Sequence, residues 1–223
     1  MPARAVFIAG GGTEIGKTYV TAALTRRLRT LGRPVRTLKP LASGVPPFGD
    51  PGFAESDTAR LLDAQDLALD DAAVEACSPW RFSAPLSPDQ AAALEGRSLD
   101  LADLVGWCRT QIAGTRGTLL IEGVGGLMSP VTETATGLDW LRALGVPALL
   151  VSGSYLGAIS HALTACETLR LHAVPLLAVA VSESEGAPAP ASTVAGAIAR
   201  HAGAPVFCLR RGQPCPEGLT DLI

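Results

Sequence analysis

The sequence predicts a single α/β domain with a mainly parallel, doubly wound sheet and helices on both faces. One observation is a glycine-rich segment, GGTEIGKT at residues 11–18, which matches the phosphate-binding pattern G-x-x-x-x-G-K-[ST] between an expected strand and an expected helix. The other is the alternation of short apolar runs with helical patterns, which is typical of right-handed βαβ units. We therefore expect a fold like that of the P-loop NTPases over residues 1–223.

The N-terminal elements follow from the spacing of the apolar residues. Residues 5–9 form a short apolar run that stops at glycines and predict a strand, while residues 16–31 have a helical spacing and residues 35–38 predict a second strand. Residues 40–55 are rich in Pro and Gly, so we expect a loop without strand or helix there. A loop of that length in a compact domain is usually functional. Residues 57–64 predict the next helix.

The same two patterns predict the remaining elements. We expect helices at residues 99–113, 159–171 and 193–201, and strands at residues 118–121, 148–151, 176–181 and 206–209.

Composition excludes several classes of protein. The net charge of -3 gives no reason to expect binding to nucleic acid or to an anionic membrane. The longest apolar runs are far shorter than the roughly 20 residues that cross a bilayer, and the N-terminus lacks the order of a signal peptide. The five cysteines are scattered without CxxC spacing, which predicts reduced, mostly buried thiols. We expect a cytoplasmic protein.

The glycine-rich segment predicts a nucleotide site. Backbone N–H groups of such a loop and of the helix behind it bind phosphates, while Lys17 is placed to reach the β and γ phosphates and Thr18 to bind Mg²⁺. The residues expected to contact the nucleotide are Gly12, Thr13, Glu14, Ile15, Gly16, Lys17, Thr18 and Tyr19.

Three further residues are candidates by position. Lys39 ends a predicted strand at the carboxyl edge of the sheet, where ligands of such folds bind, although a strand-end lysine is often only solvated. Asp57 begins a predicted helix, and on its position alone we expect an N-cap or a favourable charge at the helix N-terminus. Glu122 follows a buried strand, a position at which P-loop enzymes hold Mg²⁺. We expect Lys17 and Lys39 to lie at surface-facing ends of their elements, and His161, His172 and His201 to lie on helix surfaces or in packing contacts.

Together these segments resemble the dethiobiotin synthetases of biotin biosynthesis, in the same order over roughly residues 5–185. The segments that carry the resemblance are GGGTEIGKT at 10–18, KPLASG at 39–44, Asp57, Ser87-Pro88, EGVGG at 122–126, Asp139-Trp140 and LGAISH at 156–161. The resemblance implies conversion of 7,8-diaminopelargonate, CO₂ and ATP into dethiobiotin, ADP and phosphate.

The resemblance also implies roles for individual residues. Thr18, Asp57 and Glu122 would hold Mg²⁺, Lys17 and Lys39 would stabilise the transferring phosphoryl group, and Ser43 would bind the carbamate or phosphate. The family's pattern implies substrate contacts at Gly125 and, across a homodimer, at Gly157, Ala158 and Ser160, near a helix start suited to a carboxylate.

The chain departs from the family at the base-reading position. Ser182 stands where many members have an Asn that pairs with adenine, and the segment after Phe207 matches weakly. We therefore expect weaker selection of ATP over CTP or GTP than in relatives with Asn.

Three alternatives stay open at this point. One is a switch ATPase like the partitioning or septum-site proteins, although those usually have an additional Lys early in the phosphate loop, where this chain has Gly10-Gly-Gly12. Another is an amide-forming enzyme of the cobyrinate diamide synthetase type, which usually needs a glutaminase domain. The third is a nucleotide-binding module without catalysis.

Overall fold

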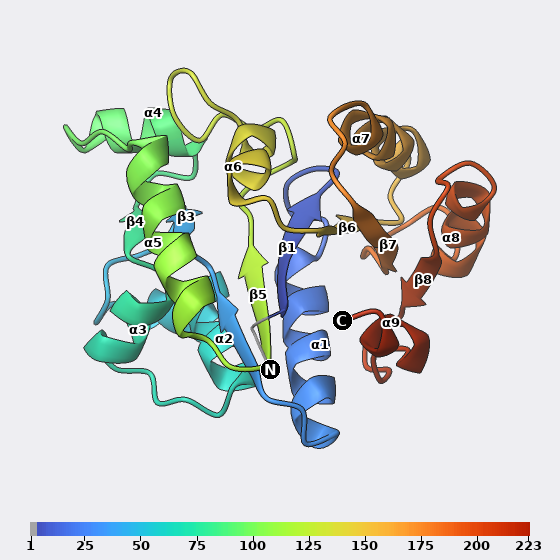
Figure 1. The fold of residues 1–223 in the computed structure, drawn as a ribbon, viewed down its shortest axis with the longest axis horizontal. Helices are drawn as coiled ribbons and strands as arrows, with labels where there is room; N and C mark the ends of the chain where they lie inside the picture. The colour runs from blue at the N-terminus through green and yellow to red at the C-terminus, as the bar shows by residue number, and fades with distance from the viewer. Residues whose placement is uncertain (1–3) are drawn as a thin grey trace.

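A computed structural model describes residues 4–223 and contains a six-stranded, all-parallel sheet with strand order β2-β5-β1-β6-β7-β8 (Figure 1). Its strands are β1 (Arg4–Gly10), β2 (Val35–Leu38), β5 (Thr118–Glu122), β6 (Ala148–Ser152), β7 (Leu176–Ser182) and β8 (Val206–Leu209). The helices are α1 (Lys17–Thr30), α2 (Asp57–Ala64), α3 (Asp71–Cys77), α4 (Pro88–Leu94), α5 (Leu101–Gly114), α6 (Gly137–Leu144), α7 (Ala158–Leu171), α8 (Ala191–Ala199) and α9 (Glu217–Asp221). This architecture confirms the predicted doubly wound, parallel fold.

The side chains of the central strand alternate between the two faces of the sheet. On β1, Phe7 points into a core with residues of α5 to α8, whereas Val6 and Ile8 point into a second core with Leu24 of α1 and Leu219 of α9. Full burial of such a side chain contributes about 1.5–3 kcal/mol, so both faces stabilise the strand. A buried sheet of this kind needs apolar residues on both faces, which explains the continuous apolar runs in the sequence.

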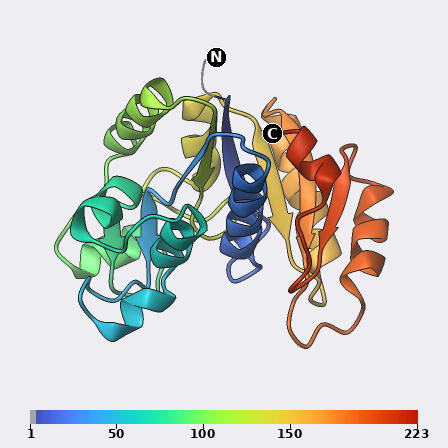
Figure 2. The same ribbon diagram turned by 90° about the horizontal axis from the view of Figure 1, so that it is seen from below.

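The segment between β2 and α5 has more regular structure than predicted, because residues 40–55 were expected to be a loop without strand or helix. Residues 41–43 form β3 (Leu41–Ser43), which pairs in parallel with β4 (Trp80–Phe82), and Pro51–Glu55 form a short 3-10 helix. In Figure 2 this segment lies beyond the β2 edge, while α8, β8 and α9 lie at the opposite edge. Strands of three residues are too short to show a period of two, which is why the composition alone indicated a loop.

Several boundaries also differ from the prediction. Strands β5, β6 and β7 each extend one residue further, to Glu122, Ser152 and Ser182, because backbone pairing continues past the last apolar side chain. Helix α8 begins at Ala191, directly after Pro190, rather than at residue 193. Helices α3, α4, α6 and α9 and strand β4 were not predicted.

Two predictions about isolated residue types are confirmed. The cysteines are free thiols, four of them buried. His161, His172 and His201 are exposed, and His161 Nδ1 lies 2.8 Å from the Tyr155 hydroxyl. Within residues 4–223, no helix is long and apolar enough to cross a bilayer.

Candidate functional site

The phosphate-binding loop connects β1 to α1 and depends on glycine for its shape. Gly16 precedes the first residue of α1 and has φ 91°, a left-handed conformation that glycine adopts without strain. A Cβ on Gly10 would lie 2.9 Å from the backbone oxygens of Gly12 and Gly125, so these two glycine segments approach too closely for a side chain. The loop therefore presents backbone N–H groups at the start of a helix, where anions bind.

Lys17 folds back over this loop. Its Nζ donates to the Gly12 backbone oxygen at 2.9 Å, and the side chain is only 7% exposed. Burial, followed by the neighbouring charge of Lys39, lowers the pKa of Lys17 from 10.5 to about 8. The ammonium is thus poorly solvated and positioned to exchange the backbone oxygen for a phosphate.

Lys39 and two carboxylates form the charged centre of the site. The Lys39 Nζ lies 2.7 Å from Glu122 Oε1 and 2.9 Å from Asp57 Oδ2, and it donates to the Gly123 oxygen at 3.2 Å. Lys39 is 3% exposed and Glu122 is 0% exposed, whereas the Asp57 side chain is 42% exposed. Lys39 directly follows β2, Glu122 ends the adjacent strand β5, and Asp57 begins α2. The pairing of β2 with β5 brings Lys39 and Glu122 together.

The prediction that Lys17 and Lys39 lie at surface-facing ends is therefore wrong. Both residues are buried, at 7% and 3% exposure, although they contribute to the lining of a cavity. The sequence shows that Lys17 follows a glycine-rich turn and that Lys39 follows an apolar strand. It does not show that segments later in the chain bury these two side chains.

The charges set the protonation states. Burial alone would lower the pKa of Lys39, but the charges of Glu122 and Asp57 outweigh it and raise the pKa above its usual range. Burial raises the pKa of Asp57, and the larger combined effect of Lys39 and the hydrogen bonds lowers it from 3.8 to about 2. Lys39 and Asp57 are therefore both charged at neutral pH.

The helix cap proposed as an alternative role for Asp57 belongs to its neighbour. Ser56 is the N-cap of α2, and its Oγ accepts from the Ala59 backbone N–H at 3.2 Å. Asp57 is the first residue of the helix, where its negative charge favours the helix dipole. Its carboxylate is directed to Lys39 rather than to the helix backbone.

The oxygen atoms around Lys39 suit Mg²⁺. Glu122 Oε1 accepts from the Thr18 hydroxyl at 2.6 Å, while Glu122 Oε2 is buried and has no hydrogen-bond partner among residues 4–223. A buried carboxylate oxygen without a partner is costly unless a cation or water satisfies it. Within the described residues no three His, Cys, Asp or Glu side chains converge on one point. Two carboxylates and a hydroxyl nevertheless fit Mg²⁺, which usually takes its other ligands from phosphates and water.

These groups line one cavity of about 670 Å³. Its walls contain predicted site residues from the phosphate loop, together with the predicted Ser43 and Gly125 and the unpredicted Ser87, Ser129 and Arg211. Gly125 has φ 62° and Ser129 Oγ accepts from the Gly126 N–H at 2.8 Å, which shapes the turn after β5. The structure thus brings Thr13–Tyr19, Lys39, Ser43, Asp57 and Gly125 together, with Glu122 behind them.

Two groups of predicted residues lie apart from this cavity. Gly157, Ala158 and Ser160 lie at the start of α7, beyond β6, and Ala158 is wholly buried in the core while the other two are exposed. Ser182 is 1% exposed, and its hydroxyl has no hydrogen-bond partner in the part of the chain that the structure describes. A Cβ on Gly16 would collide with that hydroxyl, so Ser182 lies directly beneath the phosphate loop.

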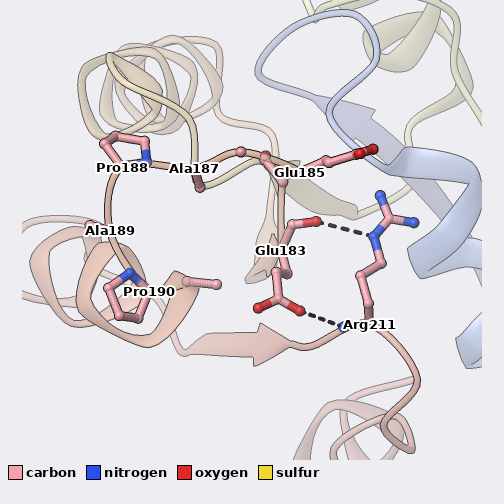
Figure 3. Close-up of a pocket in the computed structure, with 10 residues that line it drawn as sticks. Glu183, Glu185, Ala187, Pro188, Ala189, Pro190 and Arg211 are labelled. Carbon is pink, nitrogen blue, oxygen red and sulfur yellow. Dashed lines mark hydrogen bonds between the residues drawn. The ribbon is translucent and has the colours of Figure 1, made fainter.

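A second hollow, of about 770 Å³, adjoins the loop after β7 (Figure 3). It is lined by Glu183, Ser184, Glu185, Pro188, Pro190 and Arg211, among others. Sequence reasoning missed it because residues 183–190 have no period and the segment after Phe207 resembles the family weakly. The position of residues 183–190 and of the segment after Phe207 could have indicated this hollow. Each follows a strand at the carboxyl edge of a parallel sheet, where ligands bind.

The chain is similar to a described family and to curated enzymes. Residues 4–209 match the family described as an AAA domain. The ATP-dependent dethiobiotin synthetase BioD of Methylobacterium nodulans is 69% identical over 220 residues, covering 98% of each chain. The enzyme of the same name from Acidiphilium cryptum is 45% identical over 205 residues, covering 90% of this chain and 91% of its own.

Solved structures share the fold at low identity. A ParA family ATPase from Chlorobium tepidum TLS has a TM-score of 0.52 and 16% identity, covering 98% of this chain and 87% of its own. A MinC:MinD cell division complex from Aquifex aeolicus has a TM-score of 0.53 and 14% identity, covering 98% of this chain and 84% of its own. At these identities the likeness shows the fold alone.

Proposed function

The chain belongs to the ATP-dependent dethiobiotin synthetase family, and from that premise we propose which of its residues carry the reaction. The enzyme is an ATP-dependent cyclo-ligase that converts 7,8-diaminopelargonate, CO₂ and ATP into dethiobiotin, ADP and phosphate. One amine adds to CO₂ and loses a proton to give a carbamate, and a carbamate oxygen then attacks the γ-phosphorus while ADP leaves. The second amine then attacks the carbonyl carbon of the mixed anhydride, loses a proton and expels phosphate, which closes the urea ring.

The phosphate loop binds the triphosphate in this proposal. Backbone N–H groups of residues 12–16 and the N-terminus of α1 bind the phosphate oxygens. Lys17 releases the Gly12 oxygen and binds the β and γ phosphates in its place. The support is that Lys17 is close to this oxygen, at 2.9 Å, and that its ammonium is otherwise buried within the same cavity.

Thr18, Asp57 and Glu122 are the proposed Mg²⁺ ligands. The observation that carries this proposal is the buried Glu122 Oε2 without a partner, beside the Thr18 hydroxyl. When bound, Mg²⁺ supplies positive charge that neutralises the phosphate oxygens during transfer. The three side chains orient that charge toward the end of the phosphate loop.

Lys39 has two positions in this proposal. Without nucleotide it neutralises Glu122 and Asp57, at the distances given above. In the reacting complex it releases these carboxylates and binds the transferring phosphoryl group, where an ammonium stabilises the developing charge. Ser43 lies in the same cavity wall and donates a hydrogen bond to the carbamate, while the turn at Gly125 contacts the substrate.

We also propose a cytoplasmic homodimer. The start of α7, with Gly157, Ala158 and Ser160, would bind the substrate's tail carboxylate in the partner's site. Its separation from the cavity within one chain and the exposure of Gly157 and Ser160 support this assignment. The free cysteines suit a reducing compartment.

One coupled assay tests the activity against a switch ATPase or a binding module. ADP release is measured with and without diaminopelargonate plus bicarbonate, at fixed ATP and Mg²⁺. We expect release to depend on both additions and to match dethiobiotin formed. Release that is unchanged by diaminopelargonate would contradict the synthetase reaction.

A further inference from the structure

Arg211 lies where the two hollows of the site meet. It is the residue common to the lining of the phosphate-loop cavity and of the hollow beside β7. Figure 3 shows it on the side of that hollow opposite Pro188 and Pro190, with Glu183 between them. A nucleotide with its triphosphate on the loop and its base in the neighbouring hollow must therefore pass Arg211.

The guanidinium of Arg211 is held in place from two sides. Its Nε donates to the Glu183 backbone oxygen at 3.1 Å, and its backbone N–H donates to Glu183 Oε2 at 2.9 Å. Its Cζ lies 4.3 Å from the centroid of the Tyr19 ring, a cation–π contact with the first turn of α1. The Tyr19 hydroxyl donates to the Arg210 backbone oxygen at 2.9 Å, which ties the loop after β8 to α1.

These contacts leave the outer part of the guanidinium free. Among residues 4–223, neither Nη1 nor Nη2 has a hydrogen-bond acceptor. One of them, Nη2, would lie 3.9 Å from a Cβ on Gly16, beside the start of α1. A positive side chain next to the positive end of a helix is unfavourable on its own and becomes favourable when an anion lies between them.

We propose that Arg211 is a further nucleotide-binding residue, whose free Nη groups bind the triphosphate where it leaves the phosphate loop. Tyr19 and Glu183 are its positioning residues, because they fix the plane and direction of the guanidinium. An arginine in fixed orientation presents paired donors that match phosphate oxygens, which a lysine cannot reproduce. The inference rests on the proposed triphosphate site of the loop.

Isothermal titration of the full chain with ATP, CTP and tripolyphosphate, each with Mg²⁺, tests the inference. Tripolyphosphate has the phosphates without ribose or base, so it isolates the proposed contact. We expect Arg211→Met to weaken all three by roughly tenfold to a hundredfold, as for a charge-assisted hydrogen bond, with the ratio of ATP to CTP affinity unchanged. Arg210→Met is the matched control and should change each affinity by less than about twofold.

The outcomes are distinct. If Arg211→Met binds tripolyphosphate as tightly as the unaltered protein, the inference is overturned. This holds even if the affinity for ATP and CTP falls, because Arg211 would then contact the ribose or the base rather than the phosphates. If Arg211→Met does not fold, Arg211→Lys takes its place, since it keeps the positive charge but removes the paired donors of the guanidinium. Its affinity for tripolyphosphate should fall several-fold, and an unchanged affinity would overturn the inference. Failure of the unaltered protein to bind ATP and tripolyphosphate would instead count against the proposed phosphate site itself.

Discussion

Lys39 links the stability of the protein to its chemistry, and Lys39→Met separates the two. In the structure the Lys39 ammonium lies 2.7 Å from a carboxylate oxygen of Glu122, which is wholly buried. Methionine fills a similar volume but leaves that carboxylate without its counterion. Breaking a buried ion pair at one partner typically costs about 3–5 kcal/mol, and for a chain of this length that corresponds to a fall in Tm of roughly 6–20 °C.

The same substitution should lower turnover for a separate reason. An ammonium that stabilises the transferring phosphoryl group contributes about 2.7–4 kcal/mol in the transition state, or roughly a hundredfold to a thousandfold in kcat. Thermal unfolding followed by circular dichroism gives the first quantity, and steady-state ADP release, measured well below the variant's Tm, gives the second.

A double variant distinguishes the two effects. Lys39→Met combined with Glu122→Gln removes both charges, so Tm should recover most of its loss while kcat stays low or falls further. If Lys39→Met keeps the Tm of the unaltered protein, the buried ion pair does not stabilise the fold as argued. If it keeps near-normal kcat at full Mg²⁺ and ATP, Lys39 has no part in phosphoryl transfer.

Three further predictions concern Asp57, which lines the same cavity, and Ser182, which lies beneath the phosphate loop. Asp57→Asn should raise the Mg²⁺ concentration needed for half-maximal activity. It should lower Tm by only a few degrees, because Ser56 rather than Asp57 caps α2. A loss of activity that added Mg²⁺ does not recover would contradict the ligand role. The pKa of Asp57 is lowered to about 2, so its ion pair with Lys39 stabilises the protein above about pH 4 and this contribution is lost as the pH falls toward 2. The difference in unfolding free energy between the unaltered protein and Asp57→Asn should therefore shrink over that range. Ser182→Asn should weaken the binding of ATP, CTP and GTP together and lower Tm, because the larger side chain meets Gly16, whereas Ser182→Ala should be nearly neutral. The measurements are kcat/KM for the three nucleotides and Tm. A gain in selectivity for ATP without loss of Tm would instead support direct base reading at this position.

The chemistry of the phosphate loop could be predicted from the sequence because it is local. The pattern at residues 11–18 places the glycines, Lys17 and Thr18 within a few positions of one another, and its flanking strand and helix have clear periods. Lys39 and Glu122 could be identified as strand-end residues for the same reason. The burial of both lysines could not be predicted from the local pattern. For Lys39 the printed partners, Asp57, Glu122 and the Gly123 oxygen, all lie far away in the sequence.

The contact between Lys39 and Glu122 depends on the order of the strands rather than on the sequence near either residue. The two residues are 83 positions apart, yet β2 and β5 are neighbours in register, with Leu38 opposite Ile121, so the next residue of each strand emerges side by side. The alternation of strands and helices along the chain predicts that parallel strands share a carboxyl edge, but it does not predict which strands are adjacent. The resulting ion pair joins two groups to which we assign separate roles in the reaction. Under that assignment, nucleotide and Mg²⁺ offset the cost of separating Lys39 from its carboxylates. Glu122→Gln should then weaken the ion pair and free Lys39 without raising activity, because the substitution also removes the carboxylate that we assign to the metal.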